Sequence, residues 1–136
     1  MKAIKSHELL TDVPASELWK IYGTLRLEEL VTVLTPGNSN PVTYKQEFVK
    51  IDNKNYIKEL VAIEGDFLNL GFTKYVTRFE VIQKGLKSSV IKSSVVYEFD
   101  DGRPELEAPA STTPLALAAR AIVKYVKKQK ATETSS

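Results

Sequence analysis

Apolar and polar side chains alternate along several stretches of the chain, and this pattern predicts about five β-strands. We expect these strands at residues 2–13, 42–50, 56–63, 71–83 and 88–99. Turn-forming residues at 52–55 and 84–87 separate two pairs of these stretches, as in antiparallel hairpins. The pattern therefore predicts an antiparallel sheet with one face turned to solvent.

Helical spacing of apolar residues predicts three helices beside this sheet. A proline near a first turn suits the start of a short helix within residues 12–17, and a second short helix is expected at residues 25–34. A long helix is expected at residues 115–130, with one apolar stripe facing the sheet. The stripe consists of Leu115, Ala118, Ala119, Ile122 and Val126.

The order of these elements is one strand, two short helices, four strands and one long helix, which is typical of the α+β class. A chain of 136 residues suits one domain. We expect this domain to occupy residues 1–130 and the polar residues 131–136 to form a disordered tail.

The strand pattern also predicts which side chains face the long helix, because charged residues mark the solvent face of most strands. The expected inner side chains are Val42, Tyr44, Gln46, Phe48, Thr73, Tyr75, Thr77, Phe79, Val81, Ile91, Ser93, Val95, Tyr97 and Phe99. The strand at residues 56–63 stays ambiguous, since Lys58 falls on one of its faces and Glu59 on the other.

The predicted inner face carries phenols, an amide and hydroxyls, and it gains an amine if Lys58 points inward. Burying such a group without a partner costs about 1–3 kcal/mol. Either these groups pair with one another in a filled core, or they line a wet cavity that receives a ligand. We favour the cavity, because an apolar concavity with a few polar groups is the usual form of a small-molecule site.

Composition and charge exclude several kinds of partner, metal site and catalysis. The net charge of +2, from 19 basic and 17 acidic residues, is too even to indicate a nucleic-acid partner. We interpret the lysines at 124, 127, 128 and 130 as a solvated helix terminus. The chain has no cysteine and one histidine, which excludes disulfides, thiol catalysis and a multi-histidine metal site. No stretch has the apolar length of a membrane span or a signal peptide, so we expect a cytoplasmic protein without a membrane partner.

Seven segments of the sequence resemble a known plant family. They are residues 7–9, 15–22, 44–48, 51–53, 63–71, 90–94 and 113–116, and the Glu-Gly-x-x-Leu-x-Leu-Gly stretch at 64–71 is the most specific. Over residues 4–128 the chain is similar to the pathogenesis-related class-ten proteins, relatives of the major birch pollen allergen, and most of all to their norcoclaurine-synthase branch. The resemblance implies a helix-grip fold, in which a curved sheet wraps around a long C-terminal helix and encloses a ligand cavity, with no cofactor.

The same resemblance implies a set of site residues. Synthases of this branch condense dopamine with an aldehyde, and they place a Tyr, a Glu, a Lys and an Asp around the substrate. Here these positions hold Tyr44, Gln46, Lys58 and Thr77, so both carboxylates are replaced. The condensation needs bases that take protons from the amine and from the ring carbon, and neither an amide nor a hydroxyl serves as such a base.

An altered reaction is therefore expected from the resemblance. We predict an isomerase that moves a carbon–carbon double bond of a morphinan-type alkaloid ketone by proton transfer, as the related neopinone isomerase does. Lys58 would stabilise the dienolate oxygen, Tyr44 would relay a proton, and His7 is the candidate base. The predicted substrate contacts are Gln46, Phe48, Tyr75, Thr77, Ser93, Tyr97, Leu115 and Ile122.

Alternatives remain open at this point. A lone strand histidine such as His7 is often a surface or internally bonded residue, and Lys58 has an alternative interpretation as a solvent-side lysine. The whole chain is compatible with a non-catalytic carrier of small hydrophobic plant metabolites, or with a condensing enzyme of the norcoclaurine-synthase type.

The resemblance also implies two strands and a glycine-rich loop that this chain lacks before residue 42. Their absence would leave an edge of the sheet open, and open edges tend to be paired or covered. We therefore expect a homodimer that closes the sheet or the pocket.

Overall fold

The structure, a computed structural model, describes residues 2–24, 26–34, 44–107 and 110–134. Its strands are β1 (Lys2–Thr11), β2 (Tyr44–Asp52), β3 (Ile57–Gly65), β4 (Phe72–Gly85) and β5 (Ser88–Phe99). Its helices are α1 (Ala15–Tyr22), α2 (Arg26–Leu34), α3 (Asp66–Leu70), the 3₁₀ turn η1 (Pro104–Glu107) and α4 (Thr113–Thr134). The predicted α+β class and element order are confirmed, while α3 and η1 were not predicted.

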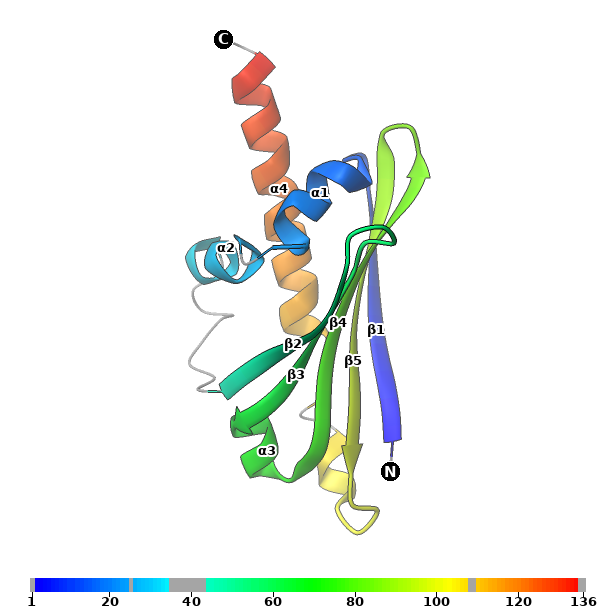
Figure 1. The fold of residues 1–136 in the computed structure, drawn as a ribbon, viewed down its shortest axis with the longest axis vertical. Helices are drawn as coiled ribbons and strands as arrows, with labels where there is room; N and C mark the ends of the chain where they lie inside the picture. Colours follow the sequence, from blue (N-terminus) through cyan, green and yellow to red (C-terminus); the bar gives the residue numbers. More distant parts are fainter. Residues whose placement is uncertain (1, 25, 35–43, 108–109, 135–136) are drawn as a thin grey trace.

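The strands form one antiparallel sheet in the order β1-β5-β4-β3-β2. The first strand joins the sheet beside the last one, in a register that runs from Lys2 opposite Glu98 to Thr11 opposite Ser89. Figure 1 shows that the helices α1, α2 and α4 gather on one side of the curved sheet. This arrangement is the predicted helix grip.

Local sequence explains the tight connections. Pro14 precedes α1, and its carbonyl accepts hydrogen bonds from the backbone N–H groups of Glu17 and Leu18. Between β2 and β3, the Asp52 carboxylate accepts hydrogen bonds from the backbone N–H groups of Lys54 and Asn55, each at 3.0 Å. An acidic side chain that binds the backbone in this way stabilises a turn, as expected for residues 52–55.

Two apolar clusters form the core between the sheet and the helices. The α1 cluster consists of Val13, Ala15, Leu18, Trp19, Ile21, Tyr22, Leu27, Leu60, Phe79, Val81, Ile91, Ala119, Ile122 and Val126. The η1 cluster consists of Ala62, Phe72, Tyr75, Val95, Tyr97, Phe99, Leu106 and Ala110. Both clusters draw on the inner faces of the strands, as the alternation predicts.

The structure settles the face of β3 and corrects one residue of β4. Lys58, Leu60 and Ala62 are buried, so they form the inner face of β3. Thr73 was predicted to point inward, but it is exposed, because the register between β4 and β5 shifts between Phe72 and Lys74. The other predicted inner residues of β4 and β5, residues 75–81 and 91–99 in alternation, are buried.

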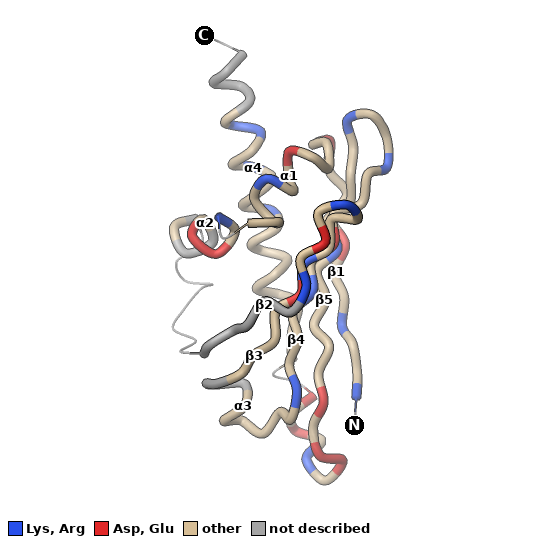
Figure 2. Tube along the Cα trace, viewed as in Figure 1, with Lys and Arg blue, Asp and Glu red and all other residues tan. Residues whose placement is uncertain are grey.

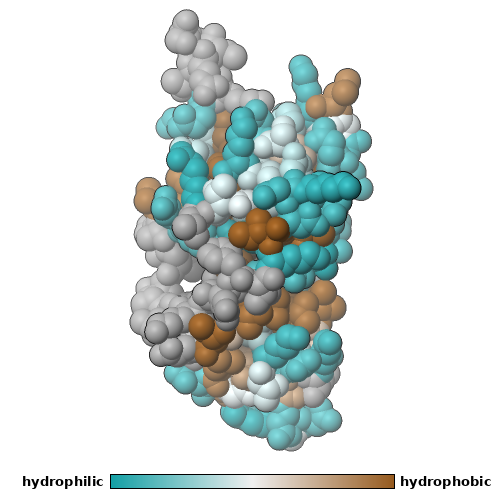
Figure 3. All heavy atoms as spheres, viewed as in Figure 1, coloured by the Kyte–Doolittle hydropathy of each residue, from teal (hydrophilic) through white to brown (hydrophobic). Residues whose placement is uncertain are grey.

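The solvent-facing surface carries both charged and apolar side chains. Opposite charges pair across strands, as between Arg78 Nε and Glu59 Oε1 at 3.7 Å, and charged residues recur along the strands and α4 (Figure 2). Apolar atoms also reach the surface, as the brown areas of Figure 3 show. Among the described residues the exposed large apolar side chains are Ile4, Leu10, Val33, Ile51, Ile63, Leu70, Leu86 and Leu117.

Two further observations concern α4 and membranes. The helix runs to Thr134, beyond its predicted end at Lys130, and the division into a domain at 1–130 and a tail stays a prediction. Across the described ranges, none of the helices combines the length and apolar character that a membrane span requires.

Candidate functional site

The most unusual side chain on the inner face is Lys58, which is 0% exposed. It extends from β3 toward the junction of α1 and α2. There its Nζ donates hydrogen bonds to the backbone oxygen of Thr24 at 3.0 Å and to Glu28 Oε1 at 2.8 Å. The prediction that Lys58 faces inward is confirmed, and the solvent-side alternative is wrong.

Glu28 connects this lysine to the outside of the molecule. It lies in the first turn of α2, next to Leu27, which is buried in the α1 cluster and fixes the helix against the sheet. A carboxylate in a first helical turn is favoured by the helix dipole. The Glu28 side chain is 38% exposed while its partner is fully enclosed, so the pair spans from solvent to the inner face.

A buried ion pair is a weak source of stability, because the cost of removing two charges from water offsets their attraction. Apolar residues of similar size often serve the fold equally well. Stability alone therefore does not account for the Lys58–Glu28 pair. An ammonium beside a carboxylate can give a proton and take one back without leaving the enclosed face.

His7 and Ser93 form a second polar spot on the inner face, opposite each other in the β1–β5 register. Ser93 is fully buried, and within the described ranges neither its Oγ nor His7 Nδ1 has a hydrogen-bond partner. Two adjacent polar atoms without a partner are costly in a dry core, and the cavity predicted at this face stays a prediction.

The register links this spot to the buried lysine. Ser93 lies opposite Phe79, and Phe79 lies opposite Lys58, so the two polar regions are separated by one phenyl ring on β4. Thr77 is the inner residue of β4 that precedes Phe79, and it is 8% exposed. His7, Ser93, Thr77 and Lys58 thus share one region of the inner face, and their predicted roles in a site stay untested.

The predicted tyrosines lie lower on the sheet, in the η1 cluster. Tyr97 is fully buried and its hydroxyl hydrogen-bonds to Glu107 Oε1. Burial, together with this carboxylate, raises the pKa of Tyr97 to about 12. Tyr75 is buried with its ring centroid 5.4 Å from that of Phe72. Both rings pack in the core, and their role as substrate contacts stays a prediction.

The two predicted contacts from α4 also pack in the core. Ile122 is 0% exposed within the α1 cluster. Leu115 is partly buried and contacts both apolar clusters. Leu115 therefore lies between the two apolar clusters.

Three predicted site residues, Tyr44, Gln46 and Phe48, have side chains outside the described residues. Their backbones belong to β2, where Tyr44 lies opposite Gly65, Gln46 opposite Ala62 and Phe48 opposite Leu60. Their predicted roles stay untested.

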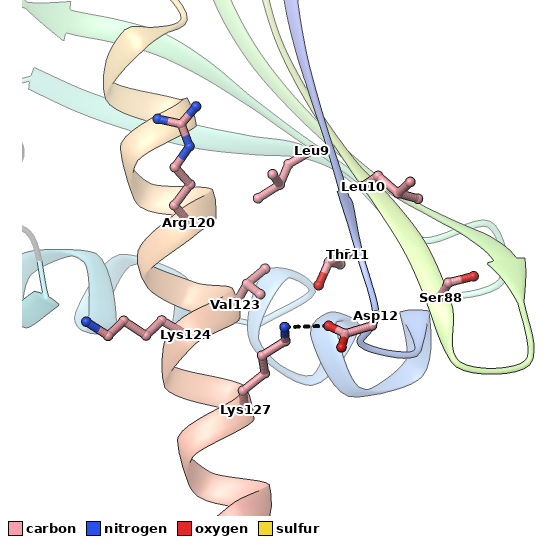
Figure 4. A pocket seen from close by; sticks show the side chains of 9 residues that line it. All are labelled: Leu9, Leu10, Thr11, Asp12, Ser88, Arg120, Val123, Lys124 and Lys127. Carbon is pink, nitrogen blue, oxygen red and sulfur yellow. Dashed lines mark ion pairs between the residues drawn. The ribbon is translucent and has the colours of Figure 1, made fainter.

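A groove of about 710 Å³ opens elsewhere, between the end of β1 and α4 (Figure 4). Lys127 Nζ lies 2.5 Å from Asp12 Oδ1 across it. The lining residues are Leu9, Leu10, Thr11, Asp12, Ser88, Arg120, Val123, Lys124 and Lys127. None of the predicted substrate contacts is among them, so this groove is distinct from the inner-face site.

Metal binding finds no support in the described part of the chain, where no three His, Asp or Glu side chains converge as metal ligands would. Lys58 and Glu28 are titratable groups at hydrogen-bond distance on this face.

Comparison with known proteins gives consistent relatives, although no family profile matches the chain. The norbelladine synthase of Narcissus pseudonarcissus is 36% identical over 96% of this chain and 95% of its own length. The S-norcoclaurine synthase of Thalictrum flavum subsp. glaucum is 31% identical over 95% of this chain and 73% of its own length. The structure of the Thalictrum flavum enzyme with dopamine and hydroxybenzaldehyde superposes with a TM-score of 0.81 at 29% identity, over 94% and 88% of the two chains.

These relatives correct the predicted reaction. They are synthases, which points to a condensing enzyme, so the predicted double-bond isomerase is wrong. The sequence argument against condensation was that Gln46 and Thr77 replace both carboxylates of the motif. That argument did not count Glu28, which reaches Lys58 from a helix far away in sequence.

Sequence reasoning missed Glu28 for a simple reason. Glu28 and Glu29 are adjacent acidic residues beside the apolar stripe of α2, and nothing in the sequence separates them. In the structure Glu29 is exposed and Glu28 is partly buried. Only the packing of α2 against α1 and α4 brings Glu28 rather than Glu29 to Lys58.

Proposed function

Because this chain belongs to the plant pathogenesis-related class-ten family, in the branch that contains norbelladine and norcoclaurine synthases, we propose that it condenses a phenolic arylethylamine with an aromatic aldehyde. The observation that carries the proposal is the enclosed ammonium of Lys58, held 2.8 Å from the Glu28 carboxylate. Lys58 also occupies the lysine position of the synthase motif.

The proposed chemistry is the formation of an imine. The amine nitrogen adds to the aldehyde carbon while the Lys58 ammonium donates a proton to the carbonyl oxygen, where negative charge develops. Glu28 accepts a proton from the nitrogen and returns one to Lys58. Both hydrogens of the amine end on the carbonyl oxygen, which leaves as water, and the carbon–nitrogen double bond forms.

We propose that the reaction stops at this imine. Closing a ring would require a base that removes a proton from the aromatic carbon. Gln46 and Thr77 stand where the synthase motif has carboxylates, and neither is such a base. Glu28 is engaged with Lys58, so it serves the first half of the reaction.

The inner face suits the proposed substrates. Phe79 and Tyr75 give this face an aromatic character, with both rings packed in the core. The unsatisfied atoms of His7 and Ser93 offer hydrogen bonds to phenolic hydroxyls. The combination of aromatic walls with a few polar atoms favours a phenol over a purely aliphatic ligand.

The test is a trapped-product assay. The protein is incubated with dopamine and 4-hydroxybenzaldehyde, samples are reduced with a hydride reagent at intervals, and the secondary amine and the cyclised product are quantified by mass spectrometry. We expect the secondary amine to accumulate faster than without protein, and the cyclised product to form at the protein-free rate.

The assay also separates the proposal from the carrier alternative. A carrier would bind the two compounds and leave the rate of imine formation at its protein-free value. A rate that the protein does not raise, with this pair and with tyramine in place of dopamine, would contradict the proposed function.

A further inference from the structure

The edge strand β1 presents an unpaired side along its whole length. It is ten residues long, and among the described strands it pairs with β5 alone. Figure 1 shows no element beside its outer edge. A long regular edge with free backbone N–H and C=O groups is a template for another strand.

The outer face of this strand carries two exposed aliphatic side chains. Ile4 is 60% exposed and Leu10 is 69% exposed, and both lie on the solvent face of β1. Pro and Gly, which interrupt pairing, do not occur between Lys2 and Thr11.

We propose that two copies of this chain pair antiparallel through β1, around a two-fold axis that passes through His7. The two sheets then continue into one another, with their inner faces on the same side. This interface uses the edge of the sheet and leaves the Lys58 region untouched, while His7 lies both on the axis and beside the proposed substrate contact Ser93.

The position of the axis follows from which side chains it brings together. With the axis at His7, Ile4 of each copy lies opposite Leu10 of the other. The dimer therefore contains two such pairs, and the exposed apolar side chains of both copies are covered. The same register sets Lys2 opposite Asp12. That carboxylate is bound by Lys127 but its side chain remains 73% exposed, so it can receive a second cation.

Neighbouring registers are poorer. An axis at Ser6 would place Ile4 opposite Glu8 and Lys2 opposite Leu10, which pairs charges with apolar side chains. An axis at Glu8 would bring two like charges together, which is destabilising across strands. The axis at His7 avoids the like-charge pair and sets the two exposed apolar side chains opposite each other. Its one charged–apolar pair is Lys5 opposite Leu9, and the Lys5 ammonium is already bound by the carbonyls of Glu107 and Ala110.

A second copy is the occupant that the side chains of β1 favour. Its exposed apolar residues Ile4 and Leu10 and its charged residues Lys2 and Asp12 complement one another when the strand meets itself antiparallel. The alignment with the Narcissus relative runs over 155 positions, whereas this chain has 136 residues, so the relative carries residues that are missing here.

The register is testable because the chain has no native cysteine. Residues directly opposite in an antiparallel pair have Cα atoms about 4.5–5.5 Å apart, which suits a disulfide. The double variant Ile4→Cys with Leu10→Cys should form a covalent dimer under mild oxidation. The single variants Ile4→Cys and Leu10→Cys should not, and cross-linking of either as efficient as that of the double variant would overturn the register.

Light scattering after size exclusion tests the dimer itself. The unmodified protein should have the mass of two chains. Leu10→Lys should reduce it to the mass of one chain, while Leu86→Lys, a substitution at a 96% exposed leucine in the β4–β5 turn, should keep the dimer. A monomeric unmodified protein, or a Leu10→Lys variant that stays dimeric, would overturn the proposal.

Discussion

Lys58 Nζ and Glu28 Oε1 are 2.8 Å apart, although the lysine side chain is fully enclosed and the glutamate is partly open to solvent. The two residues come from β3 and α2, so the contact also joins the sheet to the short helices. Few arrangements give an enclosed ammonium a route for protons to the surface. This one relationship underlies both the proposed chemistry and its most direct tests.

Replacing Lys58 by methionine should lower the rate of imine formation by at least about a hundredfold, because the acid that protonates the carbonyl oxygen is lost. Stability should change little, since Glu28 can be hydrated and methionine fills the space of the lysine stem. Steady-state kinetics and thermal unfolding measure the two effects. Lys54→Met, at an exposed turn lysine, is the matched control and should keep full activity.

Glu28→Gln should reduce the rate by about tenfold to a hundredfold, since the amide cannot return a proton to Lys58. Glu29→Gln removes an equal charge from the neighbouring exposed position and should leave the rate unchanged. The comparison is made on the initial rate of trapped secondary amine. Equal losses in the two variants would argue that only the charge of α2 matters.

Ring closure should appear when the missing carboxylates are restored. Gln46→Glu combined with Thr77→Asp is expected to form cyclised product above the protein-free rate, because a base then stands at the motif positions. The control is Gln46→Glu with Thr73→Asp, which places the second carboxylate at an exposed position of the same strand. Chromatography measures the amount of cyclised product from each double variant. Equal amounts from the two variants would count against the proposed stop at the imine.

Gly23→Ala should destabilise the protein by about 1–3 kcal/mol through overpacking. An added Cβ would lie 2.4 Å from the Trp19 ring. That ring cannot easily move, because it stacks on Tyr56 at 5.2 Å and its Nε1 donates a hydrogen bond to Asn53 Oδ1 at 2.9 Å.

Chemical denaturation measures this effect, with Gly102→Ala as control. At Gly102 the nearest atom to a new Cβ is 3.4 Å away, so its free energy of unfolding should change by less than about 0.5 kcal/mol. Since Gly23 precedes Thr24, whose carbonyl binds Lys58, activity should fall together with stability in Gly23→Ala.

Alkaline pH should destabilise the folded protein through Tyr97. Its pKa is raised from 10.0 to about 12, first by burial and then by the Glu107 carboxylate. The unfolded chain therefore loses this proton at lower pH than the folded one, and stability falls as pH rises from about 10 to about 12. Burial raises the pKa of Tyr22 as well, which acts in the same direction.

Tyr97→Phe should make this alkaline loss smaller, while at neutral pH it costs about 1 kcal/mol for the lost hydrogen bond. Urea unfolding at pH 9 and pH 11 checks the change in slope. A variant that loses as much stability as the unmodified protein between these two pH values would show that other groups dominate.

Much of the fold could be predicted because strand alternation is a strong local signal. Charged residues on one face of β4 and β5 identified Tyr75, Thr77 and Ser93 as inner residues. The prediction for Thr73 was wrong because a register shift inside β4 reverses the direction of its side chain. Alternation alone cannot reveal such a shift.

The site was less predictable than the fold. Lys58 was ambiguous because both faces of β3 carry a charge, and its direction depends on the short helices that accept its hydrogen bonds. Glu28 depends on the same long-range packing, thirty residues earlier in the chain. Pairings between distant segments are not encoded in local periodicity, so the reaction was mistaken while the architecture was predicted.

The position of β1 in the sheet has a consequence for how the protein is made. This strand is synthesised well before its partner β5, which spans Ser88–Phe99. Contacts between such distant segments form late and slow the folding of a domain. During synthesis β1 therefore stays without its native partner until β5 has been translated, and an unpaired strand of this kind exposes a nascent chain to aggregation.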